Sequence, residues 1–162
     1  MSIFWLIATV LVLTFGFVVI FGPPYLPTRR QQIEAALDLL ALKPGQTMLD
    51  LGAGDGRVMR AAAQRGWRVV GVELNPLLVL IAKLSTWRYR KQVRVIWGDY
   101  FRVTWPPANG IFTFMIGRQM AQLDKYIKAW PHKPVKLASF AFTVPGKKPA
   151  AQRKGIFLYE YN

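Results

Sequence analysis

The sequence contains no cysteine and a single histidine among its 162 residues. The lack of cysteine excludes a disulfide framework, a thiol nucleophile and metal sites built from thiolates. The one histidine, His132, stands in the turn-like sequence PHKP, which is typical of a solvated loop rather than a catalyst. No metal site is therefore predicted. The length is sufficient for one domain and an additional N-terminal segment.

Acidic residues are also scarce. There are 8 of them against 22 lysines and arginines, which gives a formal net charge of +14. Such an excess favours an anionic partner, either a membrane surface or a nucleic acid. Four of the eight acids fall in a glycine-rich turn or at the ends of predicted strands, namely Asp50, Asp55, Glu73 and Asp99. This placement indicates that they are kept for a ligand.

Charge is absent from residues 3–21, IFWLIATVLVLTFGFVVIF. About 20 helical residues, each rising about 1.5 Å, match a hydrocarbon core of about 30 Å. No basic region precedes this run, so we predict an uncleaved, single-pass transmembrane helix over residues 1–22 rather than a signal peptide. All 22 basic residues follow it. By the positive-inside rule, the remaining domain is predicted on the cytoplasmic side, next to anionic lipid.

Periodicity and turn residues predict alternating helices and strands beyond this segment. Residues 23–45 form a proline-rich connector, which begins PPYLPT, and a first helix that ends near Leu42. Residues 46–162 form the main domain, with strands over 47–51, 68–74, 93–97, 111–116, 135–143 and 155–161, and helices over 56–64, 75–90 and 119–130. This series implies an α/β fold with a mostly parallel sheet of about six strands. The link over residues 144–154 is too short for a crossover helix, so the final strand is predicted to be antiparallel.

The main domain opens with the stretch TMLDLGAGDGR, residues 47–57. A strand that leads through alternating glycines into a helix is typical of a nucleotide-binding turn. A dinucleotide fingerprint would need its third glycine at Arg57, whereas here the glycines are Gly52, Gly54 and Gly56. Asp50, two residues before the first glycine, completes a pattern that resembles motif I of class I S-adenosylmethionine (SAM) methyltransferases. The resemblance implies a Rossmann-like fold, usually of seven strands, and SAM as the cofactor.

Two further acids follow the same logic. Glu73 ends the second strand, where a carboxylate accepts hydrogen bonds from ribose hydroxyls, although the dipole of the following helix would also favour an acid there. Asp99 ends the third strand, where it is predicted to accept from the adenine amino group, with Tyr100 or Trp97 beside the ring. The predicted cofactor-binding residues are Asp50, Gly52, Ala53, Gly54, Asp55, Gly56, Glu73, Asn75, Asp99 and Tyr100.

A narrower resemblance rests on the segments PYLPT, RQQIE, LDLGAGDGRV, GVELNPLLV and WGDYF. Together they resemble the membrane-anchored protein lysine methyltransferases, a family that includes the ATP synthase c-subunit and adenine nucleotide translocase lysine N-methyltransferases. The resemblance implies that Tyr25, Thr28 and Gln119 lie on the substrate side of the site. Arg118 stands where that family tends to have a proline.

The predicted function is therefore a membrane-anchored, SAM-dependent methyltransferase that acts on a lysine side chain of a membrane protein. A lipid or small-molecule acceptor, an RNA acceptor and a non-catalytic SAM-binding module are the alternatives. Methylation of nucleic-acid bases usually goes with an [Asn/Asp]-Pro-Pro-aromatic motif after the fourth strand, where this chain has IGRQM, so nucleic acid is disfavoured. The identity of the acceptor and the oligomeric state stay open.

Overall fold

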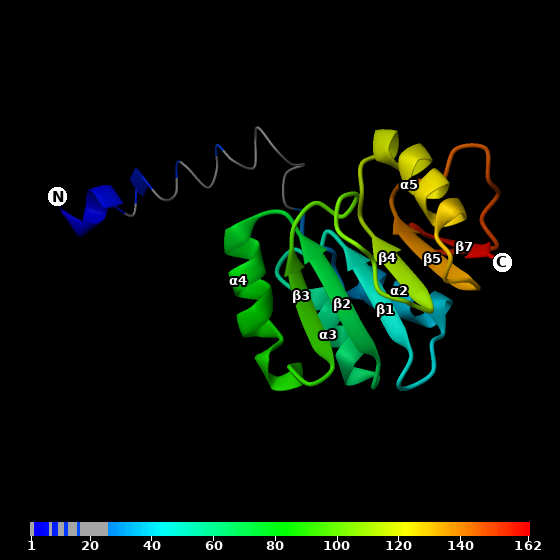
Figure 1. Ribbon diagram of the computed structural model, residues 1–162, viewed down its shortest axis with the longest axis horizontal. Helices are drawn as coiled ribbons and strands as arrows, with labels where there is room; N and C mark the ends of the chain where they lie inside the picture. Colours follow the sequence, from blue (N-terminus) through cyan, green and yellow to red (C-terminus); the bar gives the residue numbers. More distant parts are fainter. Residues whose placement is uncertain (1, 7, 10–11, 13–15, 17–25) are drawn as a thin grey trace.

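The computed structural model describes residues 2–6, 8, 9, 12, 16 and 26–162. Its centre is a seven-stranded sheet in the order β3-β2-β1-β4-β5-β7-β6 (Figure 1). The strands are β1 (Thr47–Leu51), β2 (Arg68–Glu73), β3 (Val93–Trp97), β4 (Gly110–Thr113), β5 (Val135–Phe140), β6 (Ala151–Arg153) and β7 (Ile156–Tyr161). The helices are α2 (Arg30–Leu40), α3 (Arg57–Gln64), α4 (Pro76–Ser85) and α5 (Gly117–Ala129), with the 3-10 turn η1 (Trp87–Tyr89).

The first five strands run parallel, and β7 lies antiparallel to β5, as the short final link predicts. The expected number of about six strands is wrong, because β6 pairs with β7 at the edge of the sheet. Only Lys154 and Gly155 connect these two strands, and both have positive φ angles, 50° and 77°. A two-residue turn of this kind closes a tight hairpin. The seventh strand of the sheet, β6, is thus present but only three residues long.

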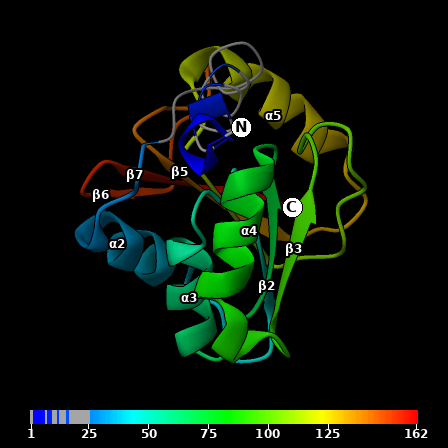
Figure 2. The ribbon, with the colours of Figure 1, turned by 90° about the vertical axis from the view of Figure 1, so that its left-hand side faces the viewer.

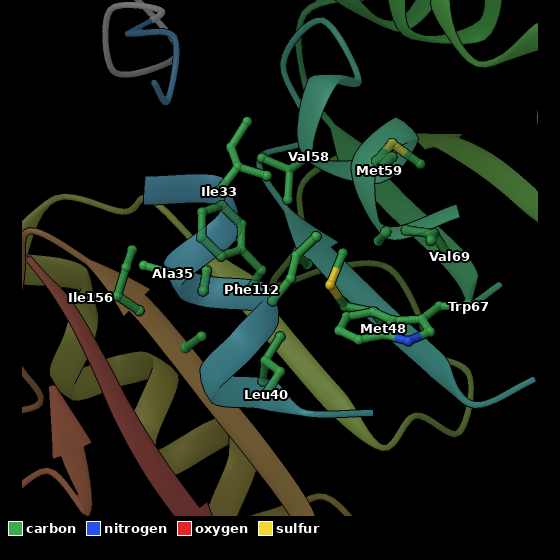
Figure 3. Packing of buried hydrophobic residues seen from close by; sticks show 14 of the residues in the cluster. Ile33, Ala35, Leu40, Met48, Val58, Met59, Trp67, Val69, Phe112 and Ile156 are labelled. Carbon is green, nitrogen blue, oxygen red and sulfur yellow. The ribbon is translucent and has the colours of Figure 1, made fainter. Parts of the chain in front are cut away.

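Helices cover both faces of the sheet (Figures 1 and 2). On one face α2 and α3 pack over a core that includes Leu37, Met48, Met59, Trp67 and Val69, several of which are labelled in Figure 3. On the other face α5 and the loop before β4 enclose a second core. Its members include Leu49, Leu51, Trp105, Ile111, Met120, Leu123, Ile127, Trp130 and Leu137. Alternate residues of β1 therefore serve opposite cores, as the two-residue period of a strand requires.

Three predicted element ends are displaced for local reasons. The helix predicted over residues 75–90 stops at Ser85, where the hydroxyl of Thr86 donates to the carbonyl of Ala82 at 2.7 Å and that of Ser85 donates to the carbonyl of Asp55 at 2.6 Å. Strand β5 stops at Phe140 because Ala141 adopts a left-handed φ of 67°. Strand β4 stops at Thr113, and residues 114–116 leave the sheet to line a cavity.

No helix within the described residues is long and apolar enough to cross a bilayer. The predicted transmembrane segment, residues 1–22, falls mostly outside the part of the chain that the structure describes.

Candidate functional site

A cavity of about 390 Å³ opens at the carboxyl ends of the parallel strands. Strand order reverses there, because β1 pairs with β2 on one side and with β4 on the other. In open α/β sheets this crevice is the usual ligand site. Its walls come from β1, β2 and β4, the segments that follow each of the five parallel strands, α4, α5 and the segment before α2. The volume is in the range of small-molecule and cofactor sites.

The glycine turn forms the floor of this cavity. Its backbone folds over the end of β2, since the N–H groups of Gly52 and Ala53 both donate to the carbonyl of Val72 at 2.9 and 3.0 Å. Gly52 has a φ of 89°, and a Cβ there would meet no atom within 4 Å, so its missing side chain leaves space toward the cavity. On the neighbouring strand a Cβ at Gly71 would approach the Cβ of Ala53 to 2.8 Å. The turn therefore packs closely on β2 and stays open toward the ligand side.

Asp50 lies under the turn at the end of β1 and is only 1% exposed. Burial, together with the negative charges of Glu73 and Asp55, raises the pKa of its carboxyl group to about 8. The Oδ2 atom of Asp50 has no hydrogen-bond partner within the described residues. A buried acceptor without a partner is costly unless a ligand satisfies it. A cationic donor such as an ammonium group would supply both a hydrogen bond and a compensating charge.

Glu73 ties the turn to the start of α4. Its Oε2 atom accepts from the backbone N–H of Gly54 at 2.9 Å, and its Oε1 atom accepts from that of Asn75 at 2.8 Å. Asn75 in turn caps α4 by accepting from the N–H of Leu77 at 2.9 Å. A carboxylate offers about four lone-pair positions, so two bonds leave Glu73 able to accept from ribose hydroxyls as well. Glu73 can thus bind the ribose and also interact with the N-terminal end of α4, so the two interpretations of this acid are compatible.

Asp55 and the substrate-side residues meet at the rim of the cavity. The carboxylate of Asp55 forms an ion pair with Arg57, with Oδ2 and Nη2 2.8 Å apart. The guanidinium of Arg57 also reaches the carbonyl of Thr28 at 3.4 Å. Thr28 is buried and lines the cavity together with Leu26 and Pro27. Arg57 therefore connects the glycine turn to the connector before α2. Tyr25 lies outside the described residues.

Asp99 and Tyr100 form the wall that follows β3. The Oδ1 atom of Asp99 accepts from the N–H of Phe101 at 2.9 Å, and Oδ2 lies 3.5 Å from Nε of Arg102. The hydroxyl of Tyr100 donates to Oε1 of Gln119 at 3.0 Å. Burial is the main reason that the pKa of Tyr100 is raised to about 12, with the charge of Asp99 adding to it. Tyr100 is therefore a neutral hydrogen-bond donor at physiological pH.

Nine of the ten predicted cofactor-binding residues line the cavity, as do Thr28 and Gln119. Gly56 does not. It caps α3 with a φ of 81°, and a Cβ there would lie 2.9 Å from Oγ of Ser85 and 3.1 Å from Cα of Ala82. Its role in the structure is to let α3 and α4 approach each other closely.

Sequence reasoning missed the apolar side of the cavity. Side chains from the ends of β4 and β5 line it, namely Phe112, Phe114, Met115, Ile116, Ala141 and Phe142. The hydroxyl of Ser139 donates to the carbonyl of Phe142 at 2.7 Å and so holds the loop after β5 in place. The aromatic residues that flank these two strand ends were the available signal, but no spacing rule connects them.

The family model described as ANTKMT methyltransferase domain matches residues 50–151. The ATP synthase c-subunit lysine N-methyltransferase of Homo sapiens is 30% identical over 128 residues, which cover 78% of this chain and 54% of that protein. The adenine nucleotide translocase lysine N-methyltransferase of Mus musculus is 34% identical over 131 residues, which cover 79% and 57%. The chain thus spans little more than half the length of these relatives.

Solved structures resemble the fold. An RNA methyltransferase from Salinibacter ruber in complex with S-adenosyl-L-homocysteine superposes with a TM-score of 0.76 at 24% identity, covering 84% of this chain and 92% of that one. A SAM-dependent methyltransferase from Thiobacillus denitrificans, also with S-adenosyl-L-homocysteine, gives a TM-score of 0.59 at 19% identity, covering 83% and 58%. At these identities the similarity concerns the fold alone.

Proposed function

The chain belongs to the ANTKMT methyltransferase domain family, and we propose that it transfers a methyl group from SAM to a lysine side chain of a membrane protein. The match confirms the predicted methyltransferase family. Similar folds solved with S-adenosyl-L-homocysteine support SAM as the cofactor. The observation that carries the proposal is that one cavity combines a carboxylate-rich side with an aromatic and aliphatic side. The first side suits the cofactor, and the second suits a methyl acceptor.

The residues of the polar side fit SAM. The carboxylate of Asp50, whose Oδ2 lacks a partner within the described residues, would bind the ammonium group of the methionine moiety. Glu73 would accept from the ribose hydroxyls, and Asp99 would accept from the adenine amino group. The turn at Gly52 leaves the space in which the backbone can approach the ligand. When bound, SAM supplies a methyl group on a sulfonium, which is already activated, so the protein contributes mainly positioning.

The apolar side fits a lysine acceptor. The ammonium form of lysine cannot attack, and its deprotonation at pH 7 costs about 4.6 kcal/mol at a reference pKa near 10.4. A channel lined by Phe114, Ile116 and Phe142 disfavours the charged form and so reduces this cost. Tyr100 is not suited to act as the base, because its raised pKa keeps it protonated. We infer that desolvation, rather than a dedicated general base, prepares the amine.

The proposal that the enzyme is anchored in a membrane is supported by its sequence. The uncharged run of residues 3–21 has the length of a bilayer span, and every basic residue follows it. In the proposed arrangement residues 1–22 anchor the enzyme and its catalytic domain lies on the cytoplasmic side. The relatives named for the ATP synthase c-subunit and for the adenine nucleotide translocase support a protein acceptor.

The test is incubation of the purified chain with methyl-labelled SAM and with membranes from the organism that produces it, followed by mass spectrometry. The expected product is label on a lysine of a membrane protein, and a Glu73→Ala variant serves as the control with weakened cofactor binding. Label that partitions into the organic phase would instead identify a lipid acceptor. Label in RNA, or SAM binding without any transfer, would also refute lysine methylation.

A further inference from the structure

Helix α4 carries apolar side chains on the face that points away from the sheet. Leu77, Leu80, Ile81 and Leu84 are 41, 54, 38 and 67% exposed. Their spacing of three and four residues places them in one row along the helix. Figure 2 shows α4 beside β2 and β3 of the sheet. Isolated exposed apolar residues are common, whereas a continuous row marks an interaction surface.

Tryptophans extend this row at both ends. Trp87, in the turn after α4, is 63% exposed, and Trp97, at the end of β3, is 65% exposed. The indole N–H of Trp97 donates to the carbonyl of Leu74 at 2.9 Å, which holds the ring beside the first turn of α4. The guanidinium of Arg90 lies 5.0 Å from the ring centre of Trp87. We call the surface formed by Leu77, Leu80, Ile81, Leu84, Trp87 and Trp97 the α4 ridge.

The charged residues of α4 and of the segment that leads from it through β3 are all basic. Residues 76–98 include the basic residues Lys83, Arg88, Arg90, Lys91 and Arg94 and no acidic residue. All five are exposed, with Lys83 on α4, Arg88, Arg90 and Lys91 in the segment that follows it, and Arg94 on β3. A protein partner for this ridge would need both an apolar groove and an acidic border. An anionic bilayer combines an apolar interior with negatively charged headgroups across its whole surface. Tryptophans also prefer its interfacial layer.

We propose that the α4 ridge is an interfacial lipid-binding surface, which lays α4 flat on an anionic bilayer with its basic residues at the headgroups. This is a second membrane contact, distinct from residues 1–22. Asn75, which caps α4, and Leu78, within it, line the cavity. Docking of α4 would therefore hold the cavity at the level of the headgroups. The proposal extends the membrane setting of the proposed function, but its test does not use methyl transfer.

The absence of native cysteine makes the test direct, because a single introduced cysteine labels uniquely. An environment-sensitive fluorophore is attached through Leu84→Cys in the full chain. Gln122→Cys, at an exposed position on α5, is the matched control. Both labelled chains are reconstituted into vesicles of phosphatidylcholine alone, or of phosphatidylcholine with phosphatidylglycerol, containing doxyl-labelled acyl chains as quenchers. Circular dichroism and thermal melting establish that each variant is folded.

With phosphatidylglycerol, the label at position 84 is expected to shift to the blue and to be quenched, while the label at position 122 is not. Adding Arg88→Gln and Lys91→Gln should reduce the ratio of docked to undocked α4 by roughly fivefold for each charge removed. An unquenched label at position 84 would overturn the proposal. So would equal quenching in both kinds of vesicle. A blue shift without lipid quenching would mean that protein covers the ridge, whether a second copy, another partner or residues 3–21.

Discussion

Glu73 and Gly54 are joined by a hydrogen bond of 2.9 Å from the backbone N–H of the glycine to the Oε2 atom of the carboxylate. The bond crosses from β2 to the turn that follows β1. It fixes the turn in position at the edge of the cavity without occupying every acceptor position of Glu73. A residue predicted from its place in the sequence to bind ribose thus also organises the loop that the cofactor contacts.

Replacing Glu73 should separate these two roles. Glu73→Gln keeps one acceptor oxygen and loses the charge, whereas Glu73→Ala loses both bonds to the backbone. Hydrogen bonds to a charged group contribute about 2 kcal/mol, so we expect Glu73→Ala to weaken SAM binding by at least roughly thirtyfold. Glu73→Gln should lie between the wild type and Glu73→Ala. Calorimetric titration with SAM measures both, and equal affinities in all three proteins would contradict the assignment.

Asp50 should make stability depend on pH. Its pKa is raised from 3.8 to about 8 in the folded protein, so the folded state binds the proton more tightly than the unfolded state. This contribution to stability is complete below about pH 4 and is lost as the pH rises to about 8. Asp50→Asn carries no titrating group. The variant should therefore gain in melting temperature relative to the wild type as the pH is raised from 5 to 8.

The same substitution should have the opposite effect on ligand binding. In the wild type, binding of an ammonium group requires the carboxylate form of Asp50, so SAM affinity should rise with pH up to about 8. Asp50→Asn should bind SAM weakly and without this dependence. Calorimetry at several pH values tests the trend. A variant that kept wild-type affinity would show that Asp50 does not face the cofactor.

Two glycines with almost the same φ angle provide a matched comparison. Gly52 and Gly45 have φ angles of 89° and 84°, and a Cβ on either would meet no atom within 4 Å. Alanine at each position should cost about 1 kcal/mol of stability through backbone strain. Only Gly52 lines the cavity. Gly52→Ala should therefore lose SAM affinity, and Gly45→Ala should not. Similar affinities in the two variants would exclude close backbone approach at Gly52.

The sequence was most informative where a local rule applies. The strand–glycine–helix pattern around Asp50 and the acids that end β2 and β3 lie on elements whose order places their carboxyl ends together. Strand β6 was missed because its three residues, Ala151–Arg153, carry no apolar alternation. Its signal was the two-residue turn at Lys154 and Gly155.

The apolar side of the cavity depends on tertiary structure. Phe114 and Phe142 are 28 positions apart in the sequence and line one cavity only because β4 and β5 are parallel neighbours. Both belong to segments that were expected to be strand but that leave the sheet. Periodicity describes regular elements and cannot identify the residues at which they stop. The acceptor side of the site is therefore less visible in the sequence than the cofactor side.

The contact between Tyr100 and Gln119 tests whether an ionisable group drives the reaction. Tyr100→Phe keeps the ring in the cavity wall but removes the bond of 3.0 Å to Oε1 of Gln119. Loss of one neutral hydrogen bond costs about 1 kcal/mol, so we expect a roughly fivefold fall in kcat/KM with little change in SAM affinity. Because the pKa of Tyr100 is about 12, the rise of activity with pH should keep its wild-type shape in this variant. At saturating SAM, deprotonation of the acceptor amine would then set that slope. If the pH profile of Tyr100→Phe flattened instead, Tyr100 would have to be assigned the role of base.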